Sequence, residues 1–181
     1  MSRPETRPPR AADHLARRLF EAGCRHAFGM PGGEVLTVMD ALARAGIEVV
    51  LARHENAAAF MAEGVWQRTG APGIVVATLG PGVLNGVNAI ANAHQDRVRL
   101  IVISGCVDAD EGLTYTHQTL DHLAVDFGHH DFAAIGRAFG GHGVRVSNRA
   151  ELRAALQAAQ QADRFTVIAA EIDRGSYDNR I

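Results

Sequence analysis

The chain has 181 residues, of which 47% are hydrophobic and 21% are charged, and its formal net charge is -2. This length suits one domain with a single core, and the balance of residues is typical of a globular protein. The small net charge gives no basis for binding nucleic acid or an anionic membrane, and no apolar run approaches the length of a membrane span.

The cysteines and the first residues indicate in which cellular compartment the protein is found. Cys24 and Cys106 lie far apart and form no CxxC motif, so we predict reduced thiols and a cytoplasmic protein. Residues 1–12 are rich in proline and arginine and have no apolar stretch behind them, which predicts a disordered tail and no secretory signal.

Helices and strands alternate along the first part of the chain. A helix capped by Asp13 and ended by Gly23 comes first. Apolar, β-branched segments then predict strands at residues 25–30, 47–52, 73–78 and 99–105. The segments between them predict helices at 34–46, 54–69 and 83–95.

After residue 105 the alternation stops and then returns. Residues 106–130 form a long connection, and a connection of that length in a globular domain is often functional. Beyond it we expect a helix at 131–140, a strand at 143–146, a helix at 149–162 capped by Ser147 or Asn148, and a strand at 165–172.

This order predicts an α/β fold with a doubly wound, mainly parallel sheet and helices on both faces. The strands are continuous apolar runs, as expected when both faces of a sheet are covered. Ligands bind such sheets at the carboxyl ends of the strands. The segments GMPGG, RHEN, TLGPG and SGCVD all fall at those ends.

Each of these segments by itself has an ordinary structural explanation. Glu55 follows a strand and begins a helix, where a carboxylate is favoured by the unpaired amides of the first turn. The TLGPG segment suits either a ligand approaching a helix N-terminus or a tight turn without a ligand. GMPGG lacks the spacing of a Walker loop or a dinucleotide fingerprint. His129 and His130 have no second pair of ligands, so we predict no metal site in the chain.

Taken in order, three segments resemble a known family. HAFGMPGG, RHENAAAFMAEGVWQRTG and GIVVATLGPGVLNGVNAIANAHQDRVRLIVISG are similar to the N-terminal pyrimidine-binding domain of thiamine-diphosphate enzymes. The nearest group contains acetolactate synthase and benzoylformate decarboxylase, and the resemblance covers residues 13–126. It implies a flavodoxin-like fold and thiamine diphosphate as cofactor.

The resemblance also implies roles for individual residues. Glu55 matches the glutamate that hydrogen-bonds the aminopyrimidine ring of the cofactor and activates it, while the cofactor supplies the carbanion chemistry. Cofactor-binding positions and looser substrate-side positions follow by the same match. The former are Pro31, Gly32, Thr78, Gly80, Pro81, Gly82 and Asn85, and the latter are Gly33, His117 and Gln118.

The chain departs from the family pattern in its second part. It has no Gly-Asp dipeptide and no Asn-Asn, so the metal motif of the family's diphosphate-binding domain is missing. Residues 127–181 instead resemble the end of that domain, joined to the first segment near residues 127–130. We expect this segment to pack onto the same sheet and its last strand to extend that sheet. Mg²⁺ would then be held by a partner.

Three hypotheses remain. In the first, the chain is the cofactor-binding half of an acetolactate synthase-like 2-oxo acid decarboxylase or carboligase, inactive alone and binding the cofactor weakly. Its partner is a second copy in a homo-oligomer or a subunit carrying the diphosphate-binding domain, and its substrate is a small 2-oxo acid.

In the second hypothesis, the chain is a folded, non-catalytic product of an internal deletion, acting at most as an oligomerisation or binding module. The third, a flavodoxin-like module for an unrelated ligand, is disfavoured by Glu55 and its spacing from the GPG turn.

Overall fold

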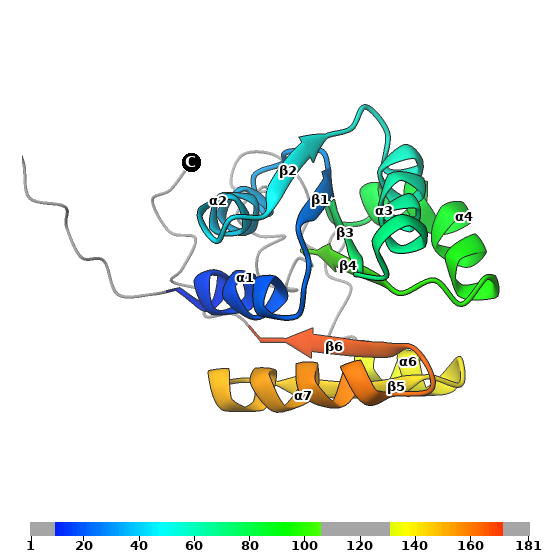
Figure 1. Cartoon of the computed structure of the whole chain (residues 1–181). Helices are drawn as coiled ribbons and strands as arrows, with labels where there is room; N and C mark the ends of the chain where they lie inside the picture. The colour runs from blue at the N-terminus through cyan, green and yellow to red at the C-terminus, as the bar shows by residue number, and fades with distance from the viewer. Residues whose placement is uncertain (1–9, 106–130, 172–181) are drawn as a thin grey trace, which may run out of the picture. The chain divides into compact units, whose positions relative to one another are not determined.

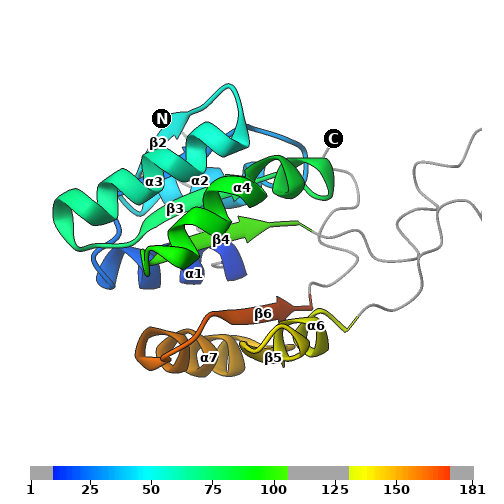
Figure 2. The same ribbon diagram turned by 90° about the vertical axis from the view of Figure 1, so that its right-hand side faces the viewer.

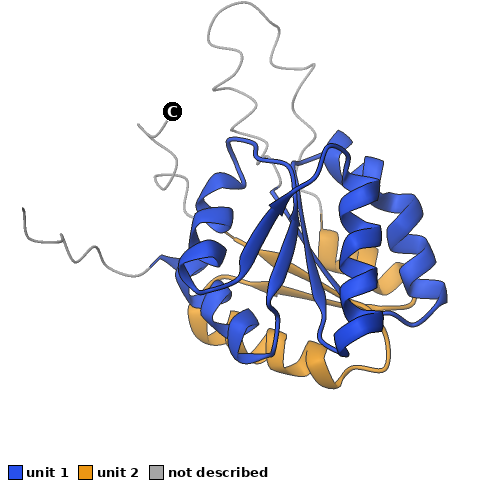
Figure 3. Cartoon of the chain, turned by 45° about the horizontal axis from the view of Figure 1, so that its top comes forward, with its two compact units in different colours: residues 1–107 blue, residues 108–181 orange. Residues whose placement is uncertain are grey.

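The computed structural model describes residues 10–105 and 131–171, which fall into two units, residues 1–107 and 108–181 (Figure 3). Residues 1–9 of the predicted tail at 1–12, the predicted long connection at 106–130 and the predicted join near 127–130 lie outside the described residues. No helix in the described ranges is both long and apolar enough to cross a bilayer.

Unit 1 alternates helices and strands as the sequence predicted (Figure 1). Each predicted strand forms within two residues of its expected bounds, because short apolar runs between turns leave few alternative registers. The elements are α1 (Ala11–Glu21), β1 (His26–Gly29), α2 (Leu36–Arg44), β2 (Glu48–Leu51), α3 (Glu55–Thr69), β3 (Gly73–Ala77), α4 (Pro81–Gln95) and β4 (Leu100–Ser104).

The four strands of unit 1 form one parallel sheet in the order β2-β1-β3-β4. Gly29 of β1 pairs with Leu51 of β2 and with Val76 of β3, so the carboxyl ends of these strands reach the same edge. The strand order reverses between β1 and β3. In doubly wound sheets, ligands bind at such a switch point, and the predicted fold class is confirmed.

Helices cover both faces of this sheet, and each face has its own core (Figure 3). On one face α1 and α2 pack Leu19 and Leu42 against Ile74 and Val76. On the other face α3 and α4 lie side by side (Figure 2) and pack small residues against Phe28 and Val75 of the sheet; they are Ala58, Ala59, Ala62 and Ala89. Small side chains allow the two helices to approach closely.

The first helix begins earlier than expected. Arg10 is the residue before α1, and Asp13 is the third helical residue, so the prediction that Asp13 caps the helix from outside was wrong. The Asp13 carboxyl instead accepts the backbone N–H of Arg10 at 2.8 Å. An acidic third residue that bonds back to the capping position satisfies one of the unpaired amides of the helix start.

Unit 2 contains α6 (Phe132–Ala138), β5 (His142–Val146), α7 (Arg149–Gln161) and β6 (Thr166–Ala170). This is the predicted order of helix, strand, helix and strand. Asn148 caps α7, with its side chain accepting the N–H groups of Ala150 and Glu151. Strand β6 pairs with β5 in a parallel two-stranded sheet separate from the first. The packing of residues 127–181 onto the first sheet stays a prediction.

Candidate functional site

Three connections of unit 1 meet at the carboxyl edge of the sheet around its switch point. They are the loop after β1, the start of α3 after β2, and the turn between β3 and α4. The sequence predicted site residues in all three. Their side chains and glycines therefore fall at the edge where this fold class binds ligands.

Glu55 is the first residue of α3 and is only 2% exposed. His54 precedes it and caps the helix, with its Nδ1 accepting the backbone N–H of Asn56 at 3.2 Å. No arginine or histidine forms an ion pair with Glu55 in the part of the chain that the structure describes. A buried carboxyl without a cation is costly, so its hydrogen bonds and its place at a helix start matter.

Asn85, on the facing helix α4, supplies such a bond. Its Nδ2 donates to Oε2 of Glu55 at 3.2 Å, although the two residues are 30 positions apart. Asn85 is the one hydrogen-bond donor to this carboxyl among residues 10–105 and 131–171. This bond from a neutral amide orients the carboxyl group, and Oε1 keeps no hydrogen-bond donor among the described residues.

Gly82 lies against the other carboxyl oxygen. A Cβ at this position would stand 3.2 Å from Oε1 of Glu55 and would collide with Oγ1 of Thr78. One turn further along α4, a Cβ at Gly86 would touch Cβ of Glu55 at 3.7 Å. The glycines of α4 therefore bring its backbone close to the buried carboxyl, as a glycine does where backbone must approach another group.

The turn before α4 has the backbone geometry that its sequence suggests. Gly80 precedes the helix with φ of 58°, a left-handed conformation that glycine adopts at little cost. Pro81 follows as the first helical residue, where its missing N–H is not needed. The predicted TLGPG turn is thus a glycine turn leading into a helix N-terminus.

The loop after β1 touches this turn at Gly32. A Cβ at Gly32 would collide with Cγ2 of Thr78, so the two loops are in direct contact. Pro31 and Gly33 are exposed, and Gly33 has open space around it. The structure therefore brings Gly32, Thr78, Gly82, Glu55 and Asn85 together around the switch point. It leaves Pro31 and Gly33 at the rim.

Two substrate-side residues predicted from the sequence, His117 and Gln118, lie outside the described residues. No group of three or more histidine, cysteine, aspartate or glutamate side chains is placed to hold a metal ion within the described ranges.

Sequence reasoning missed two carboxylates, one at this site and one further along α3. Glu34 accepts the backbone N–H of Leu79 with Oε1 at 3.1 Å. No local pattern could have predicted that bond, because its partners are 45 residues apart.

The second is Glu63, which is 6% exposed. Its two carboxyl oxygens each accept a hydrogen bond from Nδ2 of Asn92 at 3.2 Å, and Oε1 also accepts one from Nε2 of Gln67 at 3.1 Å. Its spacing of eight residues from Glu55 was a usable signal, since it places both on one helix face. The interface of α3 and α4 thus contains two buried carboxylates, each held by an asparagine of α4.

The arrangement suits a specific kind of chemistry. A carboxyl that is buried, oriented by a neutral amide and open on one oxygen can exchange a hydrogen bond or a proton with a ring nitrogen. The glycine turn beside it admits a flat group close to the backbone.

Comparison with known proteins gives a consistent result. Residues 9–125, more than half of the chain, match the family model described as thiamine pyrophosphate enzyme, N-terminal TPP binding domain.

Acetolactate synthases are among the similar proteins. The Bacillus subtilis acetolactate synthase is 40% identical over 116 residues, which are 64% of this chain and 20% of that protein. The large subunit of Escherichia coli acetolactate synthase isozyme 3 is 45% identical over 97 residues, or 53% of this chain and 17% of the relative. A probable acetolactate synthase of Mycobacterium bovis is 34% identical over 148 residues, 82% of this chain and 26% of its own length. The chain thus spans about a sixth to a quarter of the length of these relatives.

Proposed function

Because the chain belongs to the thiamine pyrophosphate enzymes, through the N-terminal TPP-binding domain of that family, we propose that it is the pyrimidine-binding half of an acetolactate synthase-like enzyme. The observation that carries this proposal is the buried Glu55 carboxyl, which accepts a hydrogen bond from the neutral amide of Asn85 and has no ion-pair partner among the described residues. A carboxylate that served only a structural ion pair would instead have an arginine or histidine beside it.

The residues around Glu55 fit the aminopyrimidine ring of thiamine diphosphate. Oε1 of Glu55 accepts no hydrogen bond from a described residue and is flanked by Gly82, whose missing side chain leaves the turn open. Thr78 and Gly32 border the same region. A neutral ring with hydrogen-bonding nitrogens suits this set better than a phosphate would, because a carboxylate repels an anion.

The roles of the chain's own residues follow from this fit. Glu55 shares a proton with a pyrimidine ring nitrogen, and Asn85 keeps the carboxyl in the orientation for that bond. The burial of Glu55 excludes water that would compete for the same hydrogen bond. The bound cofactor supplies the carbanion chemistry that the protein side chains cannot supply.

The remaining parts of the reaction belong to a partner. In this proposal a diphosphate-binding domain on another chain holds Mg²⁺ and the diphosphate, and the assembled enzyme decarboxylates or ligates a small 2-oxo acid. The names of the similar proteins, which include acetolactate synthase large subunits, support both the chemistry and the need for assembly. The reaction is a metabolic one that we place in the cytoplasm.

Residues 127–181 are part of the same proposal, as a segment derived from the end of the diphosphate-binding domain. Its helix, strand, helix and strand order supports this origin, since α6, β5, α7 and β6 form one parallel unit.

The surface of unit 1 supports a partner. Helices α3 and α4, which carry Glu55 and Asn85, also expose four large apolar side chains. They are Phe60, Met61, Leu84 and Val87, with exposed fractions of 43%, 37%, 70% and 47%. Apolar side chains gathered beside a functional site are typical of a face that another chain covers. A second copy or a subunit with the diphosphate-binding domain would bury them.

Saturation-transfer NMR with thiamine diphosphate tests the proposal, because it detects the weak binding expected of a half-site. We expect transfer to the pyrimidine protons that is larger than transfer to the thiazolium protons and that does not need Mg²⁺. The Glu55→Gln variant should lose most of this transfer, since a glutamine amide cannot share a proton with the ring. The Glu48→Gln variant, at an exposed position of β2, serves as the control.

Absence of transfer with the unaltered chain would contradict the proposal and favour a non-catalytic module. Tight binding that requires Mg²⁺ would contradict the assignment of the metal to a partner.

A further inference from the structure

Glu34 connects two loops at the switch point of the sheet. It lies in the loop after β1, and its Oε1 accepts the backbone N–H of Leu79, in the turn after β3, at 3.1 Å. Strands β1 and β3 are neighbours, and the order of strands reverses between them. This one hydrogen bond therefore joins the two loops that border the place where ligands bind such sheets.

The side chain of Glu34 is enclosed on two sides by glycines. A Cβ at Gly105, just after β4, would lie 2.8 Å from Cγ of Glu34 and 3.3 Å from its Cβ. A Cβ at Gly32 would lie 3.5 Å from Oε2. Glu34 is half-buried, and its stem lies in the space that these two glycines leave. A side chain confined in this way has few rotamers to begin with, so it loses less conformational entropy when it makes its hydrogen bond.

The bond to Leu79 acts on the turn that faces Glu55. Leu79 stands between Thr78 and Gly80, and Thr78 contacts Gly82, which lies against Oε1 of Glu55. A shift of the Leu79 amide would move this turn and, with it, the distance between Gly82 and the carboxyl. The turn has left-handed backbone at Gly80, a residue that permits many other conformations. The hydrogen bond to Glu34 restricts the turn from outside, beside the bond that Oγ of Ser104 donates to the Thr78 carbonyl at 3.3 Å.

We propose that Glu34 is a positioning residue of the cofactor site, which holds the Thr78–Gly82 turn in place by accepting the Leu79 N–H. This inference rests on the proposed function, because it assumes that the turn faces the cofactor. Glu34 acts chiefly as a hydrogen-bond acceptor at the right reach, because a neutral amide oxygen on a side chain of the same length can also accept a backbone N–H, although the carboxylate charge strengthens such a bond.

That distinction can be tested with three variants of Glu34. Glutamine keeps the length and the acceptor oxygen but removes the charge. Aspartate keeps the charge but shortens the side chain by one methylene, so its carboxyl falls short of Leu79 by about 1.5 Å. Alanine removes both. Positioning by an acceptor predicts that glutamine replaces glutamate and that aspartate behaves as alanine does.

The first measurement is the rate at which the Leu79 amide proton exchanges with water, followed by NMR in the free chain. We expect exchange to be about three- to tenfold faster in Glu34→Asp and Glu34→Ala and unchanged within about twofold in Glu34→Gln. The amide resonances of Gly82 and Glu55 should shift in the first two variants only. Glu48→Ala, on the exposed side of β2, is the control for loss of an acid.

Two results would overturn the inference. One is an unchanged Leu79 exchange rate in Glu34→Asp and Glu34→Ala, and the other is a Glu34→Gln variant that behaves as Glu34→Ala does, which would mean that the charge matters. Should the alanine variant fail to fold, the contrast between glutamine and aspartate decides.

A second measurement separates this inference from the proposed function. Saturation transfer to the pyrimidine protons of thiamine diphosphate should fall about threefold in Glu34→Asp and Glu34→Ala and persist in Glu34→Gln. Persistence in all of the variants would overturn the positioning role. If the unaltered chain shows no transfer, the proposed function fails, while the exchange rates of Leu79 still decide whether Glu34 holds the turn.

Discussion

Glycine at position 82 is required by its neighbours and not by its backbone angles. Its φ is not in the left-handed region, yet a Cβ would collide with Thr78 and crowd Oε1 of Glu55. Gly64, in the exposed middle of α3, has nothing within contact distance of a Cβ. The neighbours of Gly82 therefore require a glycine, whereas nothing around Gly64 does.

Alanine substitutions distinguish them. Gly82→Ala should lower the free energy of unfolding by about 1–3 kcal/mol, because the added methyl group displaces the turn or the carboxyl. Gly64→Ala should raise it by about 0.5–1 kcal/mol, because alanine restricts the unfolded chain and fits the helix. Urea denaturation followed by circular dichroism measures both. Equal effects at the two positions would contradict the contacts assigned to Gly82.

Cys24 is a packing residue. It is fully buried in the core under α1 and α2, and this burial raises the pKa of its thiol to about 11. Since the thiolate is the reactive form, Cys24 is a poor nucleophile at neutral pH. Cys24 is therefore not a candidate for the site chemistry.

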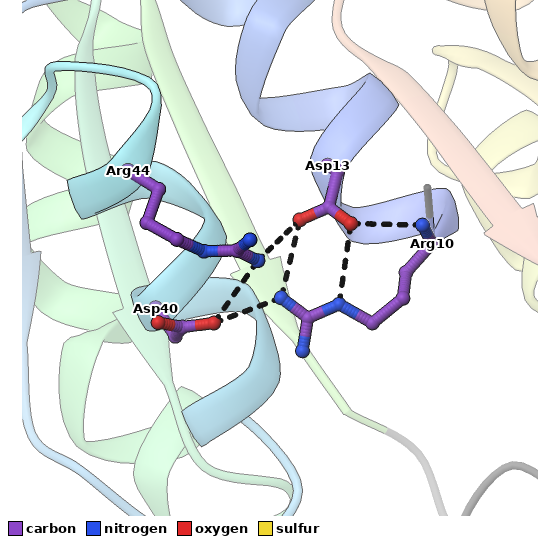
Figure 4. Close-up of polar contacts among 4 residues, drawn as sticks. All are labelled: Arg10, Asp13, Asp40 and Arg44. Carbon is purple, nitrogen blue, oxygen red and sulfur yellow. Dashed lines mark hydrogen bonds and ion pairs between the residues drawn. The ribbon is translucent and has the colours of Figure 1, made fainter. Parts of the chain in front are cut away.

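At the scale of elements, helices α1 and α2 are joined by a cluster of four charged side chains (Figure 4). Arg10 bonds Asp40 at 2.8 Å, and Arg44 bonds Asp13 at 2.6 Å, in addition to the pairs within each helix. The hydrogen bond from Arg10 holds the pKa of the Asp13 carboxyl below its ordinary value, as it does for Asp40. The cluster links the two helices of one sheet face.

This cluster makes stability depend on pH. The folded pKa of Asp13 is lowered, so its contribution is complete above the unfolded pKa and is lost as the pH falls through the folded value, below about pH 4. We expect Asp13→Asn to lower the unfolding free energy at neutral pH by about 0.5–1.5 kcal/mol. The difference should shrink progressively in acid.

Urea titrations across this pH range measure the effect. Glu21→Gln provides the matched control, because Glu21 of the same helix pairs with Arg18 at an exposed position. A loss of stability at Asp13 that is equal at neutral and acidic pH would contradict the role of the charge.

The pairing of α3 with α4 is the element contact that forms the site. Small residues bring the helices together, and two asparagines of α4 then bind two glutamates of α3 at equivalent places. Seven residues separate Asn85 from Asn92, which returns nearly to the same helix face. Because both glutamates are buried, a sliding of one helix along the other would leave a carboxylate without its donor.

At the scale of the whole molecule, the exposed apolar side chains of α3 and α4 concern assembly. Leu84 of α4 is 70% exposed, and Leu36 of α2, which covers the other sheet face, is 53% exposed. If the face with α3 and α4 is covered by a second copy of this chain, a charge there should prevent association. The same charge on α2 should not.

We expect Leu84→Glu to convert a self-associating chain into a monomer and Leu36→Glu to leave association unchanged. Sedimentation over a range of concentrations measures the mass, and circular dichroism confirms that both variants are folded. A purified chain that is monomeric at all concentrations would contradict self-association through this face.

Much of this architecture was predictable because it depends on local patterns. The apolar runs of β3 and β4 and the glycines at the ends of α1, α2 and α3 determine the alternation of strands and helices. That alternation allows few topologies, since crossovers between parallel strands are right-handed. Glu55 was found from its place between a strand and a helix and from the family resemblance. The start of α1 was predicted three residues late, because an acid fits either before a helix or within its first turn.

The element order of unit 1, the parallel sheet and the family could be predicted, because periodicity and short motifs are properties of neighbouring residues. The tertiary structure was needed to show which distant groups meet: Asn85 at Glu55, Asn92 at Glu63, and the Leu79 amide at Glu34. It also decided that β6 pairs with β5. Such contacts depend on how helices and loops pack, and packing depends on side-chain shape across the whole unit and leaves no signal at a fixed spacing along the chain.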